Sequence, residues 1–583
     1  MTILGKPQVL TDIDNLQSTV STHSTQLEDI AIELDKYIGI TDSDKLNNAI
    51  SNLNGKNGII SLSRIYTLSQ VVSVPNNITF KFNNGGILKV NSGVKVNIKG
   101  NIQAGIFQIF DCIASDIMLT ELKQEAYPQW FGAKGDRITN DNNAMNCLIY
   151  SGCPVVRIPK GEYQAYIGNG FSNRTFIFDE GSIIDGVIHI ANGDGIGVNP
   201  NATTVTYVDN VRCLGTMTST IRVGSYYCRN VNIDKIHLVE TNSKWVNQTV
   251  EGGQKGNHFT SGTENLYVGE QIIEGTTSLT YALGIDKYPS DTVNLPKNIK
   301  FGTVIINNCS TSAIAFTDFD GLTVDTLIIN SYDKYSNNFS TGKNLRIGKL
   351  YVNGQATTTA NLFGMYSQGI TNFSIDELIT EHNTNGMYVL SGTNVTINKI
   401  TANNNTGKGI YITNCNNAYL GICASYNNGQ EGVHFKSPVM VKQIFSYGNN
   451  SMGVLFDGVN GCNNSRVEKI VAYNNNNYNV FIGGNNNSVV ELLAYNPIGA
   501  KYSVNISSST NCKVDFMETY GATQGVRFLA NTNFFGRYIY THDNTTGFAM
   551  DSSSNGVYLD YIKYSNNTTN ISGGTIPATV LTT

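Results

Sequence analysis

The chain has 583 residues, with 39 Lys and Arg against 44 Asp and Glu, so its formal net charge is −5 at pH 7. Only 14% of residues are charged and 40% are hydrophobic, which excludes a long helical protein for most of the chain and also a disordered one. Nucleic-acid binding without sequence preference needs a basic surplus, so the near-neutral charge argues against it. No apolar run reaches the roughly 18 residues of a membrane span, and we expect no membrane insertion.

The first predicted element is a helix with a heptad pattern of apolar residues, interrupted by one histidine. Its core positions, in alternating steps of three and four, are Ile13, Leu16, Val20, His23, Leu27, Ile30, Leu34 and Tyr37. Such a stripe is buried only against other helices, so it favours a parallel homo-oligomeric stalk in residues 1–40. A short amphipathic helix packed on its own domain is the alternative.

Two later segments each place one helix before a series of strands. In the first, 41–125, Leu46 and Ile50 indicate a short helix, followed by strands with turns at Asn-Asn and Gly-Gly pairs. In the second, 131–190, residues 140–144 predict a helix start with Asp or Asn as the N-cap. One helix before a strand ladder is typical of the N-terminal cap of a solenoid, so we expect small α/β caps here.

The remainder is a repeat of about 23 residues. A glycine or small residue precedes an apolar–any–apolar triplet at Gly386, Gly409, Gly432 and Gly453, in steps of 21–23 residues. A second apolar strand lies between successive copies, and Asn-Asn turns often follow. No repeat has a helical period, which excludes leucine-rich and helical repeats. Alternation predicts that Val454 and Phe456 point inward.

One such coil cannot bury its own apolar face, so the coils must stack with parallel strands. The pattern therefore predicts an all-β, right-handed parallel β-helix over residues 126–575, with a short tail at 576–583. Asn suits the corners because it tolerates the left-handed backbone, and stacked Asn side chains can bond to each other. Residues 240–298 break the repeat and are expected to form an insertion.

Three segments resemble the opening of the pectate-lyase-like β-helix in tailspikes of tailed bacteriophages. They are residues 126–136 (AYPQWFGAKGD), Asn140-Asp141 and residues 158–163 (IPKGEY). The run 107–110 also resembles the head of such tailspikes. The family usually reads Gly-Asp-Gly-x-Thr-Asp-Asp here, whereas this chain has Arg137 for the second Gly and Asn140 for one acid.

The resemblance implies a homotrimer on a virion that binds and usually cleaves a bacterial capsular or O-antigen polysaccharide. It also implies attachment to phage tail or baseplate proteins through the N-terminus. The segments that carry it shape a cap and transfer no active site. The N-terminus lacks the apolar core of a secretory signal, so we expect synthesis in the host cytoplasm and action at the host cell surface.

Hydrolysis of a glycosidic bond needs two carboxylates. The best local pair is Asp318 and Asp320, where a predicted strand ends in a turn. Asp286 is expected at the matching edge one coil earlier, and Glu381 on the turn before the strand of Tyr388. An Asx-turn is the structural alternative for Asp318 and Asp320.

Outward side chains of a β-helix form rows along its axis. Aligning the repeats by their inward residues places Tyr388, Tyr411 and His434 on consecutive coils, with Lys436 at the next outward position. Aromatic rings suit the faces of sugars, and Lys436 suits an acidic sugar. A second expected row is Tyr426, Tyr447 and Tyr473. Ordinary decoration of strands is the alternative for both rows.

The expected insertion contributes Trp245 and His258 as further candidates for substrate binding, since long insertions in solenoids often serve binding. A loop with only a packing role is the alternative. A lyase would need a base such as His, Lys or Tyr beside a group that neutralises a uronate. His434 with Lys436, or His258, fits that requirement.

Ten cysteines are scattered without a CxxC pair or a Cys/His cluster of zinc spacing, so we expect buried free thiols, no metal and no cofactor. The leading hypothesis is a tailspike that degrades polysaccharide as an endo-glycosidase. A polysaccharide lyase, a sugar esterase and a non-catalytic receptor-binding fibre remain as alternatives. A bacterial adhesin or secreted pectinolytic enzyme is a third class.

Overall fold

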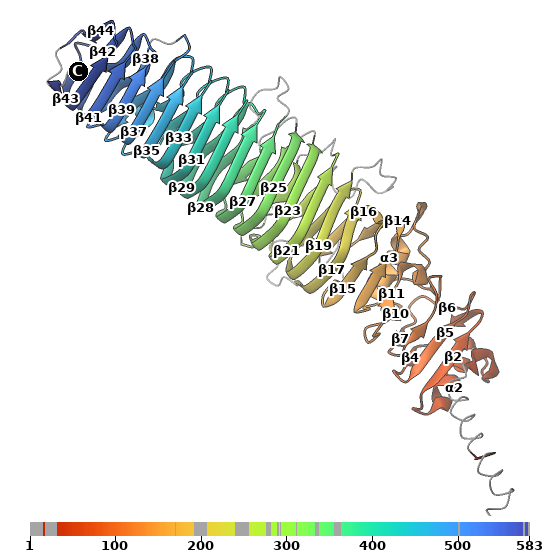
Figure 1. The fold of residues 1–583 in the computed structure, drawn as a ribbon. Coiled ribbons are helices and arrows are strands. Elements are labelled where there is room, and N and C mark those ends of the chain that lie inside the picture. The colour runs from red at the N-terminus through yellow and green to blue at the C-terminus, as the bar shows by residue number, and fades with distance from the viewer. Residues whose placement is uncertain are drawn as a thin grey trace, which may run out of the picture. The chain divides into compact units, whose positions relative to one another are not determined.

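A computed structural model describes residues 16–17, 32–168, 171–191, 207–239, 256–275, 281–287, 291, 293–309, 312–332, 337–354, 363–499, 502–574 and 578–580. Over these residues the chain is all-β, a right-handed parallel β-solenoid of about 20 turns with two α-helices and small caps, as predicted (Figure 1). It divides into two compact units. One comprises 1–198, 206–220 and 242–246, and the other 199–205, 221–241 and 247–583.

The head of the first unit is itself a short solenoid with three strands in each coil. Its strands are β2 (Gly58–Leu62), β3 (Ile65–Leu68), β4 (Val72–Val74), β5 (Ile78–Phe82), β6 (Ile87–Val90), β7 (Val96–Ile98), β8 (Ile102–Gln103), β9 (Phe110–Asp111) and β10 (Ile117–Met118). Each strand pairs in parallel with the strand three places later, which makes three small sheets. Helix α2 (Asp42–Leu53) precedes them, and a capping box closes its start, because Asp44 N donates to Thr41 Oγ1 and Thr41 N donates to the Asp44 carboxylate.

The end of the predicted heptad belongs to this head and is not α-helical. Residues 32–36 form β1 (Ile32–Glu33), which pairs in parallel with β2, and the short 3-10 helix η1 (Leu34–Lys36). Leu34 is fully buried in the head, so the prediction of one helix through Tyr37 was wrong at its end. Leu16 and Gln17 are helical, and the remaining heptad positions, His23 included, lie outside the described residues.

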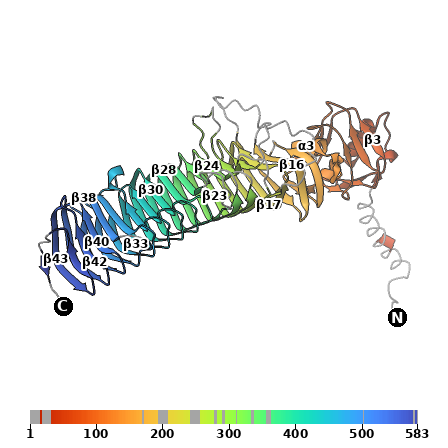
Figure 2. The ribbon, with the colours of Figure 1, turned by 90° about the horizontal axis from the view of Figure 1, so that it is seen from above.

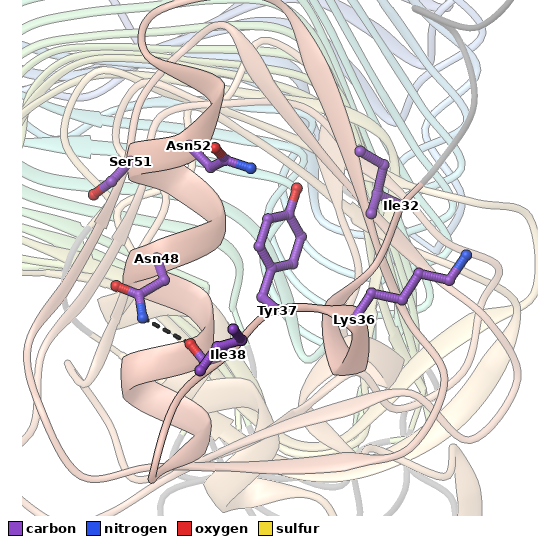
Figure 3. A pocket seen from close by; sticks show the side chains of 7 residues that line it. All are labelled: Ile32, Lys36, Tyr37, Ile38, Asn48, Ser51 and Asn52. Atoms are coloured by element: carbon purple, nitrogen blue, oxygen red, sulfur yellow. Dashed lines mark hydrogen bonds between the residues drawn. The ribbon is translucent and has the colours of Figure 1, made fainter.

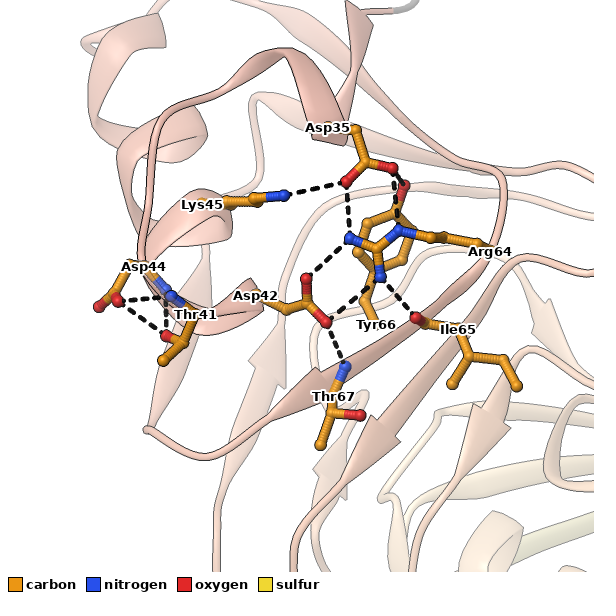
Figure 4. A network of polar contacts seen from close by, with 9 residues as sticks. All are labelled: Asp35, Thr41, Asp42, Asp44, Lys45, Arg64, Ile65, Tyr66 and Thr67. Atoms are coloured by element: carbon orange, nitrogen blue, oxygen red, sulfur yellow. Dashed lines mark hydrogen bonds and ion pairs between the residues drawn. The ribbon is translucent and has the colours of Figure 1, made fainter.

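Arg64 ties η1 and α2 to strand β3 (Figure 4). Its guanidinium donates to Asp35 at 2.6 Å and to Asp42 at 2.8 Å, and the backbone N–H of Thr67 donates to Asp42. These charge-assisted bonds hold the pKa of Asp35 well below its usual range, with Arg64 as the largest cause. The network gives residues 32–42 a structural role in the head.

A surface hollow of about 670 Å³ opens on the same head, and Tyr37 and Ile38 lie on its rim (Figure 3).

The larger solenoid begins within the first unit, with two strands in each coil. Its elements there are β11 (Glu125–Ala126), the 3-10 helix η2 (Pro128–Phe131), β12 (Asp136–Asn140), α3 (Asn142–Tyr150), β13 (Val155–Ile158), β14 (Gly161–Ile167), β15 (Arg174–Phe178), β16 (Ser182–Ala191) and β17 (Val208–Ser219). Asp141 occupies the N-cap position of α3 as expected, but its carboxylate accepts from the backbone N–H groups of Lys134 and Gly135 instead of capping the helix.

The second unit continues the two-strand pattern, and Figures 1 and 2 show its coils stacked in chain order. Its first strands are β18 (Arg222–Tyr226), β19 (Cys228–Val239), β20 (Asn257–Phe259), β21 (Glu264–Glu274), β22 (Tyr281–Ile285), β23 (Lys297–Cys309), β24 (Ser312–Thr317), β25 (Asp320–Tyr332), β26 (Asn338–Ser340), β27 (Lys343–Asn353), β28 (Phe363–Glu381) and β29 (Asn385–Asn403). All their pairings within this unit are parallel.

The strands continue in the same way as far as Val580. They are β30 (Ile410–Thr413), β31 (Cys415–Tyr426), β32 (Val433–Lys436), β33 (Val439–Tyr447), β34 (Val454–Phe456), β35 (Arg466–Tyr473), β36 (Tyr478–Asn485), β37 (Ser488–Tyr495), β38 (Tyr502–Thr510), β39 (Lys513–Tyr520), β40 (Gln524–Leu529), β41 (Thr532–His542), β42 (Thr546–Met550), β43 (Asn555–Ser565), β44 (Thr569–Ser572) and β45 (Ala578–Val580). A 3-10 helix, η4 (Gly458–Asn460), follows β34. No helix in the described part of the chain is long and apolar enough to cross a membrane.

The core of the second unit consists of the inward residues of both strands of each coil. The predicted inward residues Val454, Phe456, Val480 and Ile482 are at most 1% exposed, which confirms the alignment of the repeats. An asparagine ladder runs inside the corners, where each side-chain amide donates to the next at 2.9–3.2 Å. Its members are Asn383, Asn405, Asn428, Asn449, Asn475 and Asn479. The stacking of Asn side chains predicted from the sequence is thereby confirmed.

The predicted insertion at 240–298 is wrong for the residues that the structure describes. Strands β20, β21 and β22 lie in this range, and β21 pairs in register with both β19 and β23. The sequence hides these coils because loops of unequal length separate their strands. Trp245 lies outside the described residues.

Candidate active site

One row of outward positions follows the axis of the second unit, and we call it the axial row. Successive register pairs join His258, Gly284, Ala315, Asn338, Tyr366, Tyr388, Tyr411 and His434. The predicted alignment of Tyr388, Tyr411 and His434 is confirmed. His258, predicted on an insertion, instead belongs to this row, and Tyr366 extends the aromatic part by one coil. The sequence did not reveal either point, because the spacing between successive strands is uneven before both positions.

Three acid–base side chains meet at the N-terminal end of this row, and we call them the His258 cluster. His258 Nε2 lies 2.7 Å from Asp286 Oδ1. The Tyr281 hydroxyl lies 3.4 Å from His258 Nε2 and 3.4 Å from Asp286 Oδ2. A carboxylate only accepts, so the short contact places a proton on Nε2, and Nδ1 is the nitrogen that can act as a base when the ring carries that proton alone.

Gly284 makes this arrangement possible. Tyr281 begins strand β22, and its ring lies across the outward side of Gly284, with its hydroxyl near His258 and Asp286. A Cβ on Gly284 would come within 2.3 Å of the Tyr281 ring. Only glycine therefore leaves the ring its place beside the other two side chains. Sequence reasoning missed Tyr281, although a Tyr three residues before a Gly on an outward position is a pattern that can be searched for.

The environment keeps Tyr281 protonated. Burial raises the pKa of its hydroxyl well above the usual value, and the negative charge of Asp286 acts in the same direction. The positive charge of Arg222, on strand β18, lowers the same pKa and so lies within electrostatic reach of Tyr281. The side chains of His258 and Asp286 are 17% and 25% exposed, so both remain accessible to a ligand. The cluster thus presents a base and a proton donor to a ligand, with the buried Arg222 as a cation within electrostatic reach.

The structure describes Asp318 and Asp320 but does not bring them into the His258 cluster. Asp318 lies on the turn after β24 with φ 50°, and the buried Phe319 separates it from Asp320 in the chain. Asp320 accepts a hydrogen bond from Asn344 Nδ2 at 2.7 Å. Asn344 belongs to an outer ladder of corner asparagines in which the neighbouring position is Gly321. Asp320 therefore supplies the acceptor that Gly321 lacks, which is a structural role.

Glu381 lies in a different row from the His258 cluster. It pairs in register with Asn353 and Asn403, and it accepts a hydrogen bond from the Tyr351 hydroxyl. The same row continues into the predicted second aromatic row. Its rings are Tyr426, Tyr447, Tyr473, Tyr495, Tyr520 and His542, with centroids 4.7–5.0 Å apart. Stacking covers the faces of the inner rings, so this row presents edges and hydroxyl groups.

Further along the axial row the side chains are more buried than expected. Tyr411 is only 7% exposed and stacks on Tyr388 at 4.4 Å, while His434 is 4% exposed. Tyr411 therefore offers no free face to a sugar. Tyr366 and Tyr388 are half-buried, and Tyr388 stacks on both Tyr366 and Tyr411. Lys436 lies 3.7 Å from Asp457, and Lys408, which sequence reasoning missed, contacts His434.

No protein-family model and no curated protein matches the chain. Two solved structures from Azotobacter vinelandii are similar to it. The A-module of the mannuronan C-5 epimerase AlgE4 is 12% identical over 79% of this chain and 100% of that chain, with a TM-score of 0.33. The A-module of the epimerase AlgE6 is 11% identical over 78% of this chain and 98% of that chain, with a TM-score of 0.23. Similarity at this level assigns no role to any residue of this chain.

Proposed function

We propose that the chain binds an extended polysaccharide along the axial row and cleaves it by β-elimination at the His258 cluster. The observation that carries this proposal is the meeting of His258, Tyr281 and Asp286 within hydrogen-bonding reach of one another. The cluster contains one carboxylate, which both other side chains engage. A glycoside hydrolase typically needs a pair of carboxylates, one on each side of the bond that breaks, so proton abstraction suits this site better than hydrolysis.

The geometry supports one assignment of roles. His258 Nδ1 removes the proton from the carbon next to the carboxylate of a uronate residue. The electron pair forms a double bond to the adjacent carbon, whose bond to the glycosidic oxygen breaks. Tyr281, kept protonated by its raised pKa, gives its proton to the departing oxygen. Asp286 holds both rings, and Arg222 contributes the positive charge that favours the enolate-like transition state.

Cleavage assays with a panel of capsular and O-antigen polysaccharides test this proposal. Elimination creates an unsaturated uronate that absorbs in the near ultraviolet, whereas hydrolysis creates reducing ends without that absorbance. We expect the absorbance from the wild-type chain and its loss in His258→Ala. Reducing ends without absorbance would replace this proposal by hydrolysis. Loss of that activity in Asp318→Asn or Asp320→Asn, with His258→Ala still active, would place the site at the two aspartates.

The biological setting in the proposal rests on the tailspike resemblance. The chain forms a homotrimer on a phage virion, attaches to tail proteins through its N-terminus and acts on a capsule or O-antigen at the host surface. Light scattering tests the assembly, because a trimer has three times the 63.5 kDa of the chain. A non-catalytic receptor-binding fibre is the outcome if the chain binds a polysaccharide of the panel but releases neither product.

A further inference from the structure

Two lysine ammonium groups lie beside Tyr411, at the C-terminal end of the aromatic part of the axial row. Lys408 Nζ is 4.9 Å from the centroid of the Tyr411 ring, and Lys436 Nζ is 5.7 Å from it. The two lysine side chains are 23% and 25% exposed. Tyr411 itself is nearly buried, so the accessible groups here are the cations and not the ring.

A buried histidine holds one of these cations. Lys408 Nζ lies 2.6 Å from His434 Nδ1. An ammonium group only donates, so Nδ1 accepts and the ring carries its proton on Nε2, which lies 3.3 Å from Asp457 Oδ2. The neutral imidazole thus positions the ammonium group without cancelling its charge. Glu431, at 3.3 Å from Lys408, balances part of that charge.

Donors remain free for a ligand at this place. The Lys408 ammonium has three N–H groups, of which one donates to His434, while Glu431 lies 3.3 Å away as an ion pair. Lys436 Nζ is 3.7 Å from Asp457, beyond hydrogen-bond distance. The described solenoid also contains plain ion pairs, such as Lys399–Glu377 and Lys469–Glu491, which close at 2.7 Å. The distances from Lys408 to Glu431, 3.3 Å, and from Lys436 to Asp457, 3.7 Å, are longer than in those pairs.

We propose that Lys408 and Lys436 form an anchoring subsite for the carboxylate of an acidic sugar, with His434 as the positioning residue. The inference rests on the proposed function, because it uses the same face. Seven register steps separate His434 from His258, roughly 34 Å at about 4.8 Å per step. The substrate is therefore a long acidic polymer, bound both at the His258 cluster and at this remote subsite.

Binding to immobilised polygalacturonate, an acidic polymer, and to dextran, a neutral one, tests the subsite. His258→Ala serves as the background so that no cleavage occurs. We expect polygalacturonate to bind at least about tenfold more tightly than dextran, and Lys408→Met with Lys436→Met to remove that preference. The control is Lys399→Met with Lys469→Met, which makes the same charge change in a different row and should keep the preference.

His434 is tested through the same ratio of affinities. His434→Leu should lose the preference for polygalacturonate while dextran binding and thermal stability stay near the background values. His434→Gln should restore part of it, because the amide oxygen can accept from Lys408. Unchanged preference in the Lys408→Met and Lys436→Met variant, or no preference in the background protein, would overturn the subsite. Full cleavage activity in His258→Ala would instead overturn the proposed function, and the binding comparison would still decide the subsite.

Discussion

The ring of Tyr281 occupies the space in which any residue other than glycine at position 284 would carry its Cβ, with a predicted approach of 2.3 Å. A Cβ at position 284 would displace the Tyr281 ring, whose hydroxyl reaches His258 and Asp286. The lack of a side chain at Gly284 is therefore a condition for this acid–base cluster. A single glycine thereby determines whether three side chains from two coils form one cluster.

Gly284→Ala should therefore lower turnover by about 100-fold, since displacing a catalytic group by about 1 Å has effects of that size. The solenoid should keep its fold, because the ring can move outward toward solvent. Turnover and circular dichroism of the purified variant check this. Ala315→Gly, one coil further along the axial row, is the control and should keep wild-type turnover. Normal turnover in Gly284→Ala would remove Tyr281 from the mechanism.

His258→Ala and Tyr281→Phe should each lower turnover by about 10²–10⁴-fold, the usual effect of removing a general base or acid. Asp286→Asn should lower it as well, because Asn cannot hold the proton on His258 Nε2 as a carboxylate does. Asp318→Asn and Asp320→Asn should leave turnover unchanged if the His258 cluster is the active site. Asp515→Asn is the control, since Asp515 forms an ion pair with Lys513 away from the axial row. Turnover rates of these variants, measured at saturating substrate, decide between the two sites.

Phe456→Ala should destabilise its coils by about 3–5 kcal/mol, because Phe456 is 1% exposed and its ring packs on Phe435 at 5.6 Å. Unfolding rates are the suitable measurement, since a long solenoid with slow unfolding can hide an equilibrium change. Leu455→Ala is the control, because Leu455 points outward in the next position of the axial row. Equal unfolding rates for both variants would contradict the assignment of inward positions.

Stability should fall as the pH drops from about 6.5 to about 4 through the protonation of His434. Burial, and then the positive charge of Lys408, lower the pKa of His434 to about 4. The unfolded chain keeps the ordinary value near 6.5, so between these values it binds more protons than the folded chain. The full contribution, about 3 kcal/mol, is present above pH 6.5 and lost below pH 4. His434→Gln should show a shallower decline of unfolding free energy over this range, and an identical slope would refute the lowered pKa.

Removal of residues 1–31 should abolish the predicted homotrimeric stalk and leave the head folded. Removal of residues 1–40 should in addition destabilise the head, because it deletes Leu34 and the Asp35 carboxylate that binds Arg64. Thermal unfolding of the two truncated proteins distinguishes these effects, with Arg64→Met in the intact chain as a matched loss of the network. Equal stability of both truncations would show that β1 and η1 contribute little.

The sequence determined the fold because the information is local. Apolar residues alternate within each coil at a steady interval, so Val454 and Phe456 have to point inward and the coils have to stack. The same alternation places Tyr388, Tyr411 and His434 in one row. Corner asparagines repeat for the same reason, since each turn needs a left-handed backbone.

The candidate site depended on tertiary structure, because loops of unequal length hide the register between coils. His258 and Asp286 are 28 positions apart in the chain and 2.7 Å apart in space. Tyr281 joins them only because Gly284 leaves room for its ring, and Lys408 reaches His434 from the turn of the preceding coil. Composition and spacing specify which face a residue takes within its own strand. The stacking of the coils sets the register between their strands, and this register decides which side chains meet across coils.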